Sequence, residues 1–207
     1  MKNTKLYEQH SFPTMIVISG PSGVGKDTIA RSLIDRDPER FYFVVTATTR
    51  PPRESETQGQ DYFFVSNDEF AQMIEEDELL EYAVVYNDFK GVPKQQIRDA
   101  LAGNRDVIMR VDVQGAATIR KLVPNAIFVF LATETEADLD KRLRERKSET
   151  AEGLQLRIAT ARQEMKRLNE FDYCVVNADG YQERAVDQIF SIIEAAHCRV
   201  EQSPITL

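Results

Sequence analysis

Short apolar runs alternate with amphipathic stretches along most of the chain. The run TMIVISG (14–20) has the length and composition of a buried strand. The following stretch, KDTIARSLIDRD (26–37), places Ile29, Leu33 and Ile34 on one face of a helix. The same pattern predicts further strands over 41–48, 107–115, 126–133 and 173–179, and further helices over 116–122, 135–147, 152–169 and 182–198. This alternation predicts an α/β fold with a parallel sheet that helices cover on both faces.

Residues 46–103 interrupt the alternation. They begin with a loop marked by proline and glycine, TTRPPRESETQGQ, followed by a short strand, DYFFVS. A helix, NDEFAQMIEEDEL, and a strand, LEYAVVY, come next. We interpret this segment as an insertion that packs beside the sheet and supplies a second binding surface.

The composition mainly excludes some classes of protein and of partner. A chain of 207 residues suits one compact domain, or one core with insertions. No apolar run is long enough to cross a bilayer, and residues 1–13 lack the apolar segment of a signal peptide. We therefore expect a flexible leader over 1–13 and no membrane partner. The net charge of −8 argues against a nucleic-acid partner, so local basic clusters must bind any anionic substrate.

The cysteines and histidines suggest no catalytic chemistry. Cys174 and Cys198 do not have the spacing of metal ligands, so we expect their thiols to be buried or inert. Two cysteines also argue against a disulfide framework, and we therefore expect a reducing compartment, the cytoplasm. His10 and His197 lie near the two ends of the chain, which argues against a histidine-based site.

A glycine-rich motif lies between the first predicted strand and helix. Glycines in such a turn let backbone N–H groups point at phosphate oxygens, and the helix N-terminus adds positive potential. A lysine at its end can reach the outer phosphates. The strand, the spacing, the lysine and the helix are all present, which favours a phosphate-binding loop over a turn without a ligand. The residues are Gly20, Pro21, Ser22, Gly23, Val24, Gly25 and Lys26.

Asp27 departs from this motif, because serine or threonine usually follows the lysine and holds Mg²⁺ through its hydroxyl. The Asp27 carboxylate is a suitable oxygen ligand for Mg²⁺, directly or through water. Alternatively, Asp27 is an acidic residue favoured by the helix dipole, and Thr28 contacts phosphate. The sequence leaves both interpretations open.

A second anion site is indicated by the loop after residue 46. Arg50 and Arg53 flank two prolines, and arginine binds phosphate through two parallel hydrogen bonds. The prolines reduce the entropy that is lost when the arginines are positioned. Tyr62 can donate its hydroxyl to the same anion.

The quoted motifs, with VDVQGA and FDYCVVNAD, resemble those of guanylate kinases, in the same order from about 15 to 199. This resemblance implies a P-loop nucleoside monophosphate kinase fold, with a parallel-sheet core, a GMP-binding insertion and a helical lid. It also implies transfer of a phosphoryl group from ATP to GMP or dGMP, with Mg²⁺ as cofactor. The expected boundaries are 14–45, 104–142 and 161–207 for the core, 46–103 for the insertion and 143–160 for the lid.

The resemblance also implies roles for individual residues. Glu81 would accept hydrogen bonds from guanine N1 and the exocyclic amine, and a carboxylate does match two adjacent donors that adenine lacks. Asp112 would lie close to the base and the metal. Asn177 occupies a position of contact with adenine. The GMP phosphate would be bound by Thr46, Arg50, Arg53 and Tyr62, and when the lid closes the ATP phosphates would be bound by Arg142, Arg146 and Arg157.

Four positions differ from the usual family pattern. Lys90 replaces a tyrosine expected on the GMP phosphate, and Val92 replaces a polar residue expected on guanine O6. Arg110 stands where an acidic residue is usual, so it either donates to guanine O6 or to Asp27, or pairs structurally with Asp112. With Asp27, these residues resemble the variant guanylate kinases of plant organelles and some bacteria.

Two further functions compete with this interpretation. One is a kinase of related fold with a shifted acceptor, such as ribose 1,5-bisphosphate. The other is a non-catalytic guanylate-kinase-like module that binds protein partners, although such modules typically lose the loop lysine and the lid arginines that this chain keeps. The expected ligands are ATP and GMP, and homodimer formation is left open.

Overall fold

The computed structural model describes residues 12–85, 87–145 and 151–207. Its centre is a parallel five-stranded sheet with the strand order β2-β7-β1-β8-β9. This arrangement confirms the predicted α/β class. The strands are β1 (Met15–Ser19), β2 (Phe41–Phe43), β7 (Asp106–Arg110), β8 (Ile127–Ala132) and β9 (Tyr173–Val176).

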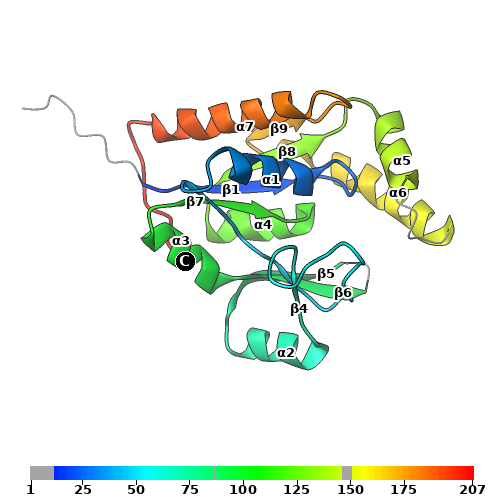
Figure 1. Ribbon diagram of the computed structural model, residues 1–207, viewed down its shortest axis with the longest axis horizontal. Helices are drawn as coiled ribbons and strands as arrows, with labels where there is room; N and C mark the ends of the chain where they lie inside the picture. Colours follow the sequence, from blue (N-terminus) through cyan, green and yellow to red (C-terminus); the bar gives the residue numbers. More distant parts are fainter. Residues whose placement is uncertain (1–11, 86, 146–150) are drawn as a thin grey trace, which may run out of the picture.

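Helices cover both faces of this sheet (Figure 1). Successive side chains of β1 point to opposite faces, so both faces of this central strand need apolar residues. Ile16 and Ile18 pack in one buried cluster with residues of α1 and α7. Met15 and Val17 pack in a second cluster with residues of α3 and α4. These helices are α1 (Lys26–Arg36), α3 (Lys94–Ala102), α4 (Val113–Leu122) and α7 (Gln182–His197).

A second sheet of four strands, in the order β4-β3-β6-β5, forms from the segment that interrupts the alternation. It has a small core of its own around Ala47, Phe70 and Leu79. Helix α2 (Asn67–Glu75) covers it and begins with a capping box between Ser66 and Glu69. The strands are β3 (Ala47–Thr48), β4 (Phe63–Phe64), β5 (Leu79–Val85) and β6 (Asp88–Pro93).

The prediction of one strand over 41–48 was wrong. The chain leaves the first sheet after β2 and enters the second at β3. Between them, the side-chain amide of Gln96 accepts from the Val45 N–H and donates to the Val45 carbonyl, each at 3.0 Å. A distant side chain thus replaces the ladder hydrogen bonds and lets the chain change sheets.

The prediction of a strand over 107–115 was too long. β7 ends at Arg110, and the Asp112 side chain accepts a hydrogen bond of 2.8 Å from the Gly115 N–H. This bond caps α4, which therefore begins at Val113. Neither β6 nor α3 was predicted as a separate element.

Two further helices, α5 (Glu136–Arg144) and α6 (Ala151–Met165), lie beside the carboxyl end of β8 (Figure 1). The predicted helix over 152–169 ends earlier, at Met165, and a short 3₁₀ turn, Leu168–Glu170, follows it. The predicted end of the preceding helix, residues 146–147, lies outside the described residues.

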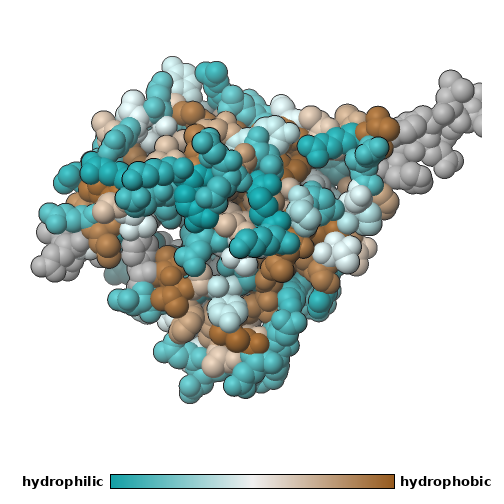
Figure 2. All heavy atoms as spheres, turned by 180° about the vertical axis from the view of Figure 1, so that it is seen from behind, coloured by the Kyte–Doolittle hydropathy of each residue, from teal (hydrophilic) through white to brown (hydrophobic). Residues whose placement is uncertain are grey.

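On the face shown in Figure 2, hydrophilic side chains predominate and hydrophobic ones form smaller groups between them. No helix within the described ranges is both long and apolar enough to span a membrane. Cys174 and Cys198 are exposed free thiols, so of the two expected alternatives, buried or inert, burial is wrong.

Candidate active site

An open cavity of about 640 Å³ joins the two sheets. Its walls combine the loop before α1 and the end of β7 with residues of the second sheet and its loops. Ligands of open α/β sheets bind at the carboxyl ends of the strands, and the end of β7 lies in this wall. The predicted site residues that line the cavity are Ser22, Gly23, Gly25, Lys26, Asp27, Thr28, Thr46, Arg50, Arg53, Tyr62, Glu81, Lys90, Asp112 and Arg157.

The glycine-rich loop is shaped by close backbone contacts. Gly20 has a φ of +132°, and a β-carbon there would lie 2.2 Å from the Leu131 carbonyl oxygen. Gly25 has a φ of +92°, and a β-carbon there would lie 2.5 Å from Nδ2 of Asn177. Both positions therefore require glycine.

Lys26 is the cation of this loop. Its Nζ donates to the carbonyl oxygens of Gly20 (2.6 Å) and Pro21 (2.9 Å). Burial lowers the pKa of Lys26 to about 8, although Glu164 and Asp112 oppose this shift. An ammonium group held by two backbone carbonyl oxygens at the phosphate loop is placed to bind phosphate oxygens.

Glu164 is a site residue that the sequence analysis missed. It lies on α6, lines the cavity and faces Lys26. Burial raises the pKa of Glu164, and the Lys26 charge opposes this shift. Its Oε2 is buried without a hydrogen-bond partner among the described residues. A single glutamate in a charged helix carries no sequence signal for such a position.

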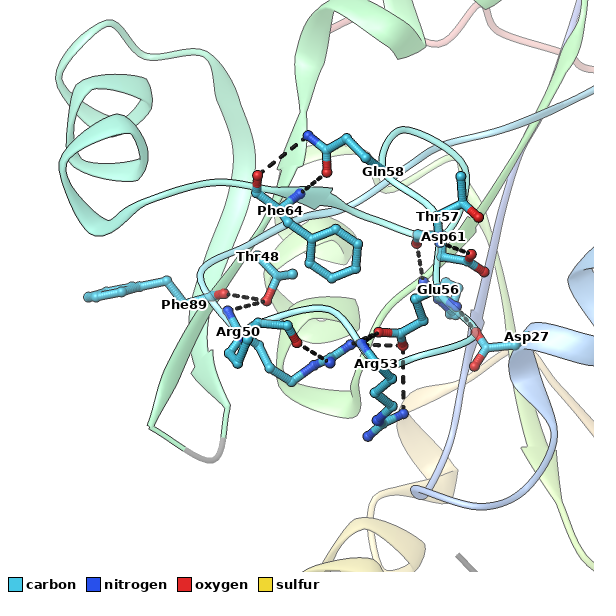
Figure 3. A network of polar contacts seen from close by, with 12 residues as sticks. Asp27, Thr48, Arg50, Arg53, Glu56, Thr57, Gln58, Asp61, Phe64 and Phe89 are labelled. Atoms are coloured by element: carbon cyan, nitrogen blue, oxygen red, sulfur yellow. Dashed lines mark hydrogen bonds and ion pairs between the residues drawn. The ribbon is translucent and has the colours of Figure 1, made fainter. Parts of the chain in front are cut away.

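Arg50 and Arg53 converge on Glu56, which the sequence analysis also missed (Figure 3). Nη2 of Arg50 lies 2.8 Å from both carboxylate oxygens of Glu56, and the Arg53 backbone N–H donates to the same carboxylate at 2.8 Å. Partial burial opposes the shift, but these hydrogen bonds lower the pKa of Glu56. Glu56 thus holds the arginines through contacts that a phosphate can also make. Its spacing of three from Arg53 was the available signal.

Three cations surround the ring of Tyr62. The Arg50 guanidinium lies 5.4 Å from the ring centroid, the Lys90 ammonium 5.8 Å and the Arg110 guanidinium 4.6 Å. Burial lowers the pKa of Lys90. Arg50 and Arg110 already pair with Glu56 and Asp27, and the three cationic side chains together make this part of the cavity suited to binding an anion.

Glu81 also lines the cavity. Its side chain is buried against Gly115, and its Oε2 has no hydrogen-bond partner among the described residues. Burial raises the pKa of Glu81 to about 8, and the charge of Asp112 adds to this shift. A buried carboxyl group with unused acceptor capacity is suited to a ligand that brings its own donors.

The structure pairs Arg110 with Asp27. The two side chains form an ion pair, and Nη2 of Arg110 also donates to the Asp61 carbonyl oxygen at 3.1 Å. Burial lowers the pKa of Arg110 to about 10. Of the alternatives for Arg110, this geometry favours contact with Asp27.

Several predicted site residues lie behind the cavity wall. Val92 is buried in the core beside Leu80 and Ile97. Asn177 donates from Nδ2 to the Val24 carbonyl oxygen at 2.9 Å and so braces the phosphate loop. Arg142 donates from Nε to Asp179 at 3.0 Å and from Nη2 to the Asn177 carbonyl oxygen at 2.8 Å. Gly20, Pro21 and Val24 belong to the phosphate loop and contact other parts of the protein: Gly20 lies against Leu131, and the carbonyl oxygens of Pro21 and Val24 accept hydrogen bonds from Lys26 and Asn177. Arg146 lies outside the described residues.

The fold and this cavity define a nucleotide-binding protein of the phosphate-loop α/β class. The family model described as guanylate kinase matches residues 13–196, and the chain belongs to the guanylate kinase family.

Relatives and a solved structure agree with this assignment. The chain is 52% identical over 196 residues to "Guanylate kinase 2, chloroplastic/mitochondrial" of Oryza sativa subsp. japonica, covering 94% of this chain and 68% of the rice protein. It is 40% identical over 188 residues to a guanylate kinase of Clostridium tetani, covering 91% and 88% of the two chains. The crystal structure of guanylate kinase from Anaplasma phagocytophilum has the same fold, with a TM-score of 0.76, 24% identity, and coverage of 93% and 90%.

Proposed function

We propose that this chain is an ATP-dependent transferase that phosphorylates GMP and dGMP, giving ADP and the diphosphate. The observation that carries the proposal is one cavity that joins a lysine-bearing phosphate loop to a buried carboxyl group and a cluster of cations. These are the parts needed for a donor triphosphate, a guanine base and an acceptor phosphate. Family membership supports this proposal over the two competing functions.

Glu81 is proposed to recognise the guanine base through hydrogen bonds. Guanine presents N1–H and the exocyclic amine side by side, so an ionised carboxylate accepts from both at once. Adenine has an acceptor at N1 and therefore leaves one carboxylate oxygen without a partner, which is costly in a buried site. Asp112 is proposed to lie beside the base as well, and Val92 supports this wall from the core.

The acceptor phosphate is proposed to bind where Arg50 and Arg53 now hold Glu56. Tyr62 and Lys90 lie against the same place, and Thr46 lines the cavity nearby. Arginine binds phosphate through two parallel hydrogen bonds, so Arg50 can exchange the Glu56 carboxylate for a phosphate. The GMP phosphate is already an anionic nucleophile, so the transfer needs no general base.

The donor phosphates are proposed to bind along the loop 20–28, with Lys26 on the outer ones. Phosphoryl transfer depends on in-line positioning and on neutralising charge on the moving group. Arg157 already lines the cavity. Arg142 and Arg146 are proposed to join it when the lid, 143–160, closes and excludes water. Asn177 is proposed to contact adenine in addition to bracing the loop.

Mg²⁺ is proposed to arrive with ATP as part of the substrate complex. The described residues contain no group of three or more histidine, cysteine or acidic side chains placed to hold a metal by themselves. Asp27 and Thr28 nevertheless place oxygen atoms on the cavity wall, which is the donor type that Mg²⁺ prefers. These two residues would therefore complete the shell of a metal held chiefly by phosphates, whose charge it would neutralise.

The proposal also covers the metabolic role, the compartment and the domain boundaries of the chain. We place the enzyme in purine nucleotide metabolism in a reducing compartment, the cytoplasm, with no nucleic-acid or membrane partner. The core is assigned to 14–45, 104–142 and 161–207, and the GMP-binding insertion to 46–103. A measurement of molecular mass in solution would show whether the chain forms a homodimer.

The decisive experiment is a coupled ADP-release assay with ATP, Mg²⁺ and a panel of acceptors. The panel contains GMP, dGMP, IMP, AMP, UMP and ribose 1,5-bisphosphate. Selective turnover of GMP and dGMP is the expected result. Preference for another acceptor would overturn the assignment of the base, and absence of turnover with every acceptor would favour a binding module.

A further inference from the structure

Four charged residues form a continuous chain of contacts from the phosphate-loop helix to the acceptor loop. Asp27 and Arg31 lie on α1, Arg110 ends β7, and Asp61 lies in the loop before β4. Asp27 pairs with Arg110, Arg110 donates to the Asp61 carbonyl oxygen at 3.1 Å, and the Asp61 carboxylate pairs with Arg31. We call this group the latch. Figure 3 labels Asp27 and Asp61 beside the polar contacts of the acceptor loop.

The latch has a buried centre and a more exposed end. The Arg110 side chain is 9% exposed, whereas the Arg31 side chain is 65% exposed. A buried guanidinium without an anionic partner is strongly unfavourable, so Arg110 and Asp27 depend on each other. The exposed pair of Arg31 and Asp61 contributes less, because water screens it.

Arg110 also fixes the acceptor side. Its guanidinium lies 4.6 Å from the Tyr62 ring centroid and 5.5 Å from that of Phe43, so it contacts two aromatic rings. The Asp61 carboxylate accepts from the Thr57 N–H at 2.8 Å, which holds the start of the same loop. The position of Tyr62 therefore depends on Arg110, and that of Arg110 depends on Asp27.

From this geometry we propose that Arg110 is a positioning residue through which Asp27 of the donor loop controls acceptor binding. This inference rests on the proposed function, because it assigns GMP to the side of Tyr62 and ATP to the side of Asp27. Asp27 holds the guanidinium, the guanidinium holds Tyr62, and the acceptor site is thereby assembled before ATP binds. The two sites are then coupled in free energy, and the coupling acts in both directions.

The test is the affinity for GMP in the absence of ATP and Mg²⁺, measured by calorimetry. Asp27 belongs to the donor side, so a merely local role leaves this affinity unchanged. If the latch positions Tyr62, Asp27→Asn should weaken GMP binding by about fivefold or more, which is within the usual range of affinity changes caused by coupling between two sites. Arg110→Gln weakens it at least as much. The double variant is no weaker than Arg110→Gln alone, because both changes break one interaction.

Asp35→Asn is the matched control, since Asp35 is an exposed residue of α1 and the substitution removes the same charge. It should leave the affinity for GMP unchanged. Unchanged or tighter GMP binding by Asp27→Asn would overturn the latch, as would additive effects in the double variant. Failure of the wild-type chain to bind or phosphorylate GMP would instead overturn the proposed function, so the two failures are distinguishable.

Discussion

Glu81 and Gly115 face each other so closely that a β-carbon at residue 115 would lie 3.0 Å from Oε1 of Glu81. The missing side chain at Gly115 gives the carboxyl group its place in the wall, where burial and Asp112 raise its pKa to about 8. Glu81 is therefore mostly protonated in the free protein at neutral pH. A guanine that donates two hydrogen bonds requires the ionised form, so base binding and proton release are linked.

The first prediction concerns the pH dependence of GMP binding. Because GMP selects ionised Glu81, its affinity should rise with pH until about pH 8, and each pH unit below that value should weaken binding about tenfold. Calorimetry from pH 6 to pH 9 measures this slope and the released proton. Glu81→Gln is the control, because it keeps the titration of the GMP phosphate and removes that of the protein. Equal slopes for the two proteins would contradict the prediction.

The same carboxyl group makes stability depend on pH. Its folded-state pKa of about 8 lies above the ordinary value of 4.5, so its contribution is fully present below pH 4.5 and is lost as pH rises to about 8. Glu81→Gln removes this loss. The loss is about 1.4 kcal/mol for each pH unit between these two pKa values, so at pH 8 the variant should be more stable than the wild type by about 4 kcal/mol. At pH 5 the difference should be much smaller. Urea unfolding at both pH values provides the comparison, and a difference that does not change with pH would refute it.

Replacing the loop lysine should abolish transfer without unfolding the chain. Lys26→Ala removes the cation that neutralises the donor phosphates, and kcat should fall by at least about a hundredfold. Since burial of this charge is itself unfavourable, the unfolding midpoint should change little. Single-turnover kinetics and thermal unfolding measure the two effects. A folded variant with near-normal turnover would show that Lys26 does not have this role.

The acceptor phosphate site depends on the shape of arginine as well as on its charge. Arg50→Lys keeps the charge but loses the planar guanidinium, which now contacts both carboxylate oxygens of Glu56 through Nη2 and can bind a phosphate through two parallel hydrogen bonds. We expect KM for GMP to rise about tenfold, with a smaller change in KM for ATP. Arg98→Lys, on the exposed face of α3, is the matched control. An unchanged KM for GMP would place the phosphate elsewhere.

Gly20 tests the shape of the phosphate loop. In Gly20→Ala, the new β-carbon would meet the Leu131 carbonyl oxygen at 2.2 Å, on a backbone with a φ of +132°. We expect a loss of at least about 2 kcal/mol in stability together with weaker ATP binding. Gly180→Ala is the control, since Gly180 has a φ of +77° and no atom within 4 Å of the added carbon. Similar losses in the two variants would mean that the backbone angle alone, and not the contact, is responsible.

Much of this molecule could be predicted from local sequence. Apolar runs located every strand of the first sheet, although the bounds of 41–48 and 107–115 were wrong. The signal was clearest for β1 and β8, because a strand buried on both faces must be continuously apolar. The phosphate loop could be recognised because its glycines, its lysine and its flanking elements are all adjacent in the chain. The arginine loop was recognisable for the same reason.

The failures concern contacts between distant segments. The strand over 41–48 divides because Gln96 takes both backbone groups of Val45. Glu164 reaches the cavity only because α6 packs beside the phosphate loop. Neither side chain differs in its local pattern from an ordinary surface residue.

The sequence by itself therefore determined the fold class, the phosphate loop and the types of side chain available for two anions and a base. Hydrophobic periodicity and turn chemistry are local properties, because each depends only on residues that are close together in the chain. Only the tertiary structure decided that Arg110 pairs with Asp27, that Glu56 holds the arginines and that Gly115 makes room for Glu81. Such pairings depend on where whole elements pack, and packing sums many weak contacts across the chain.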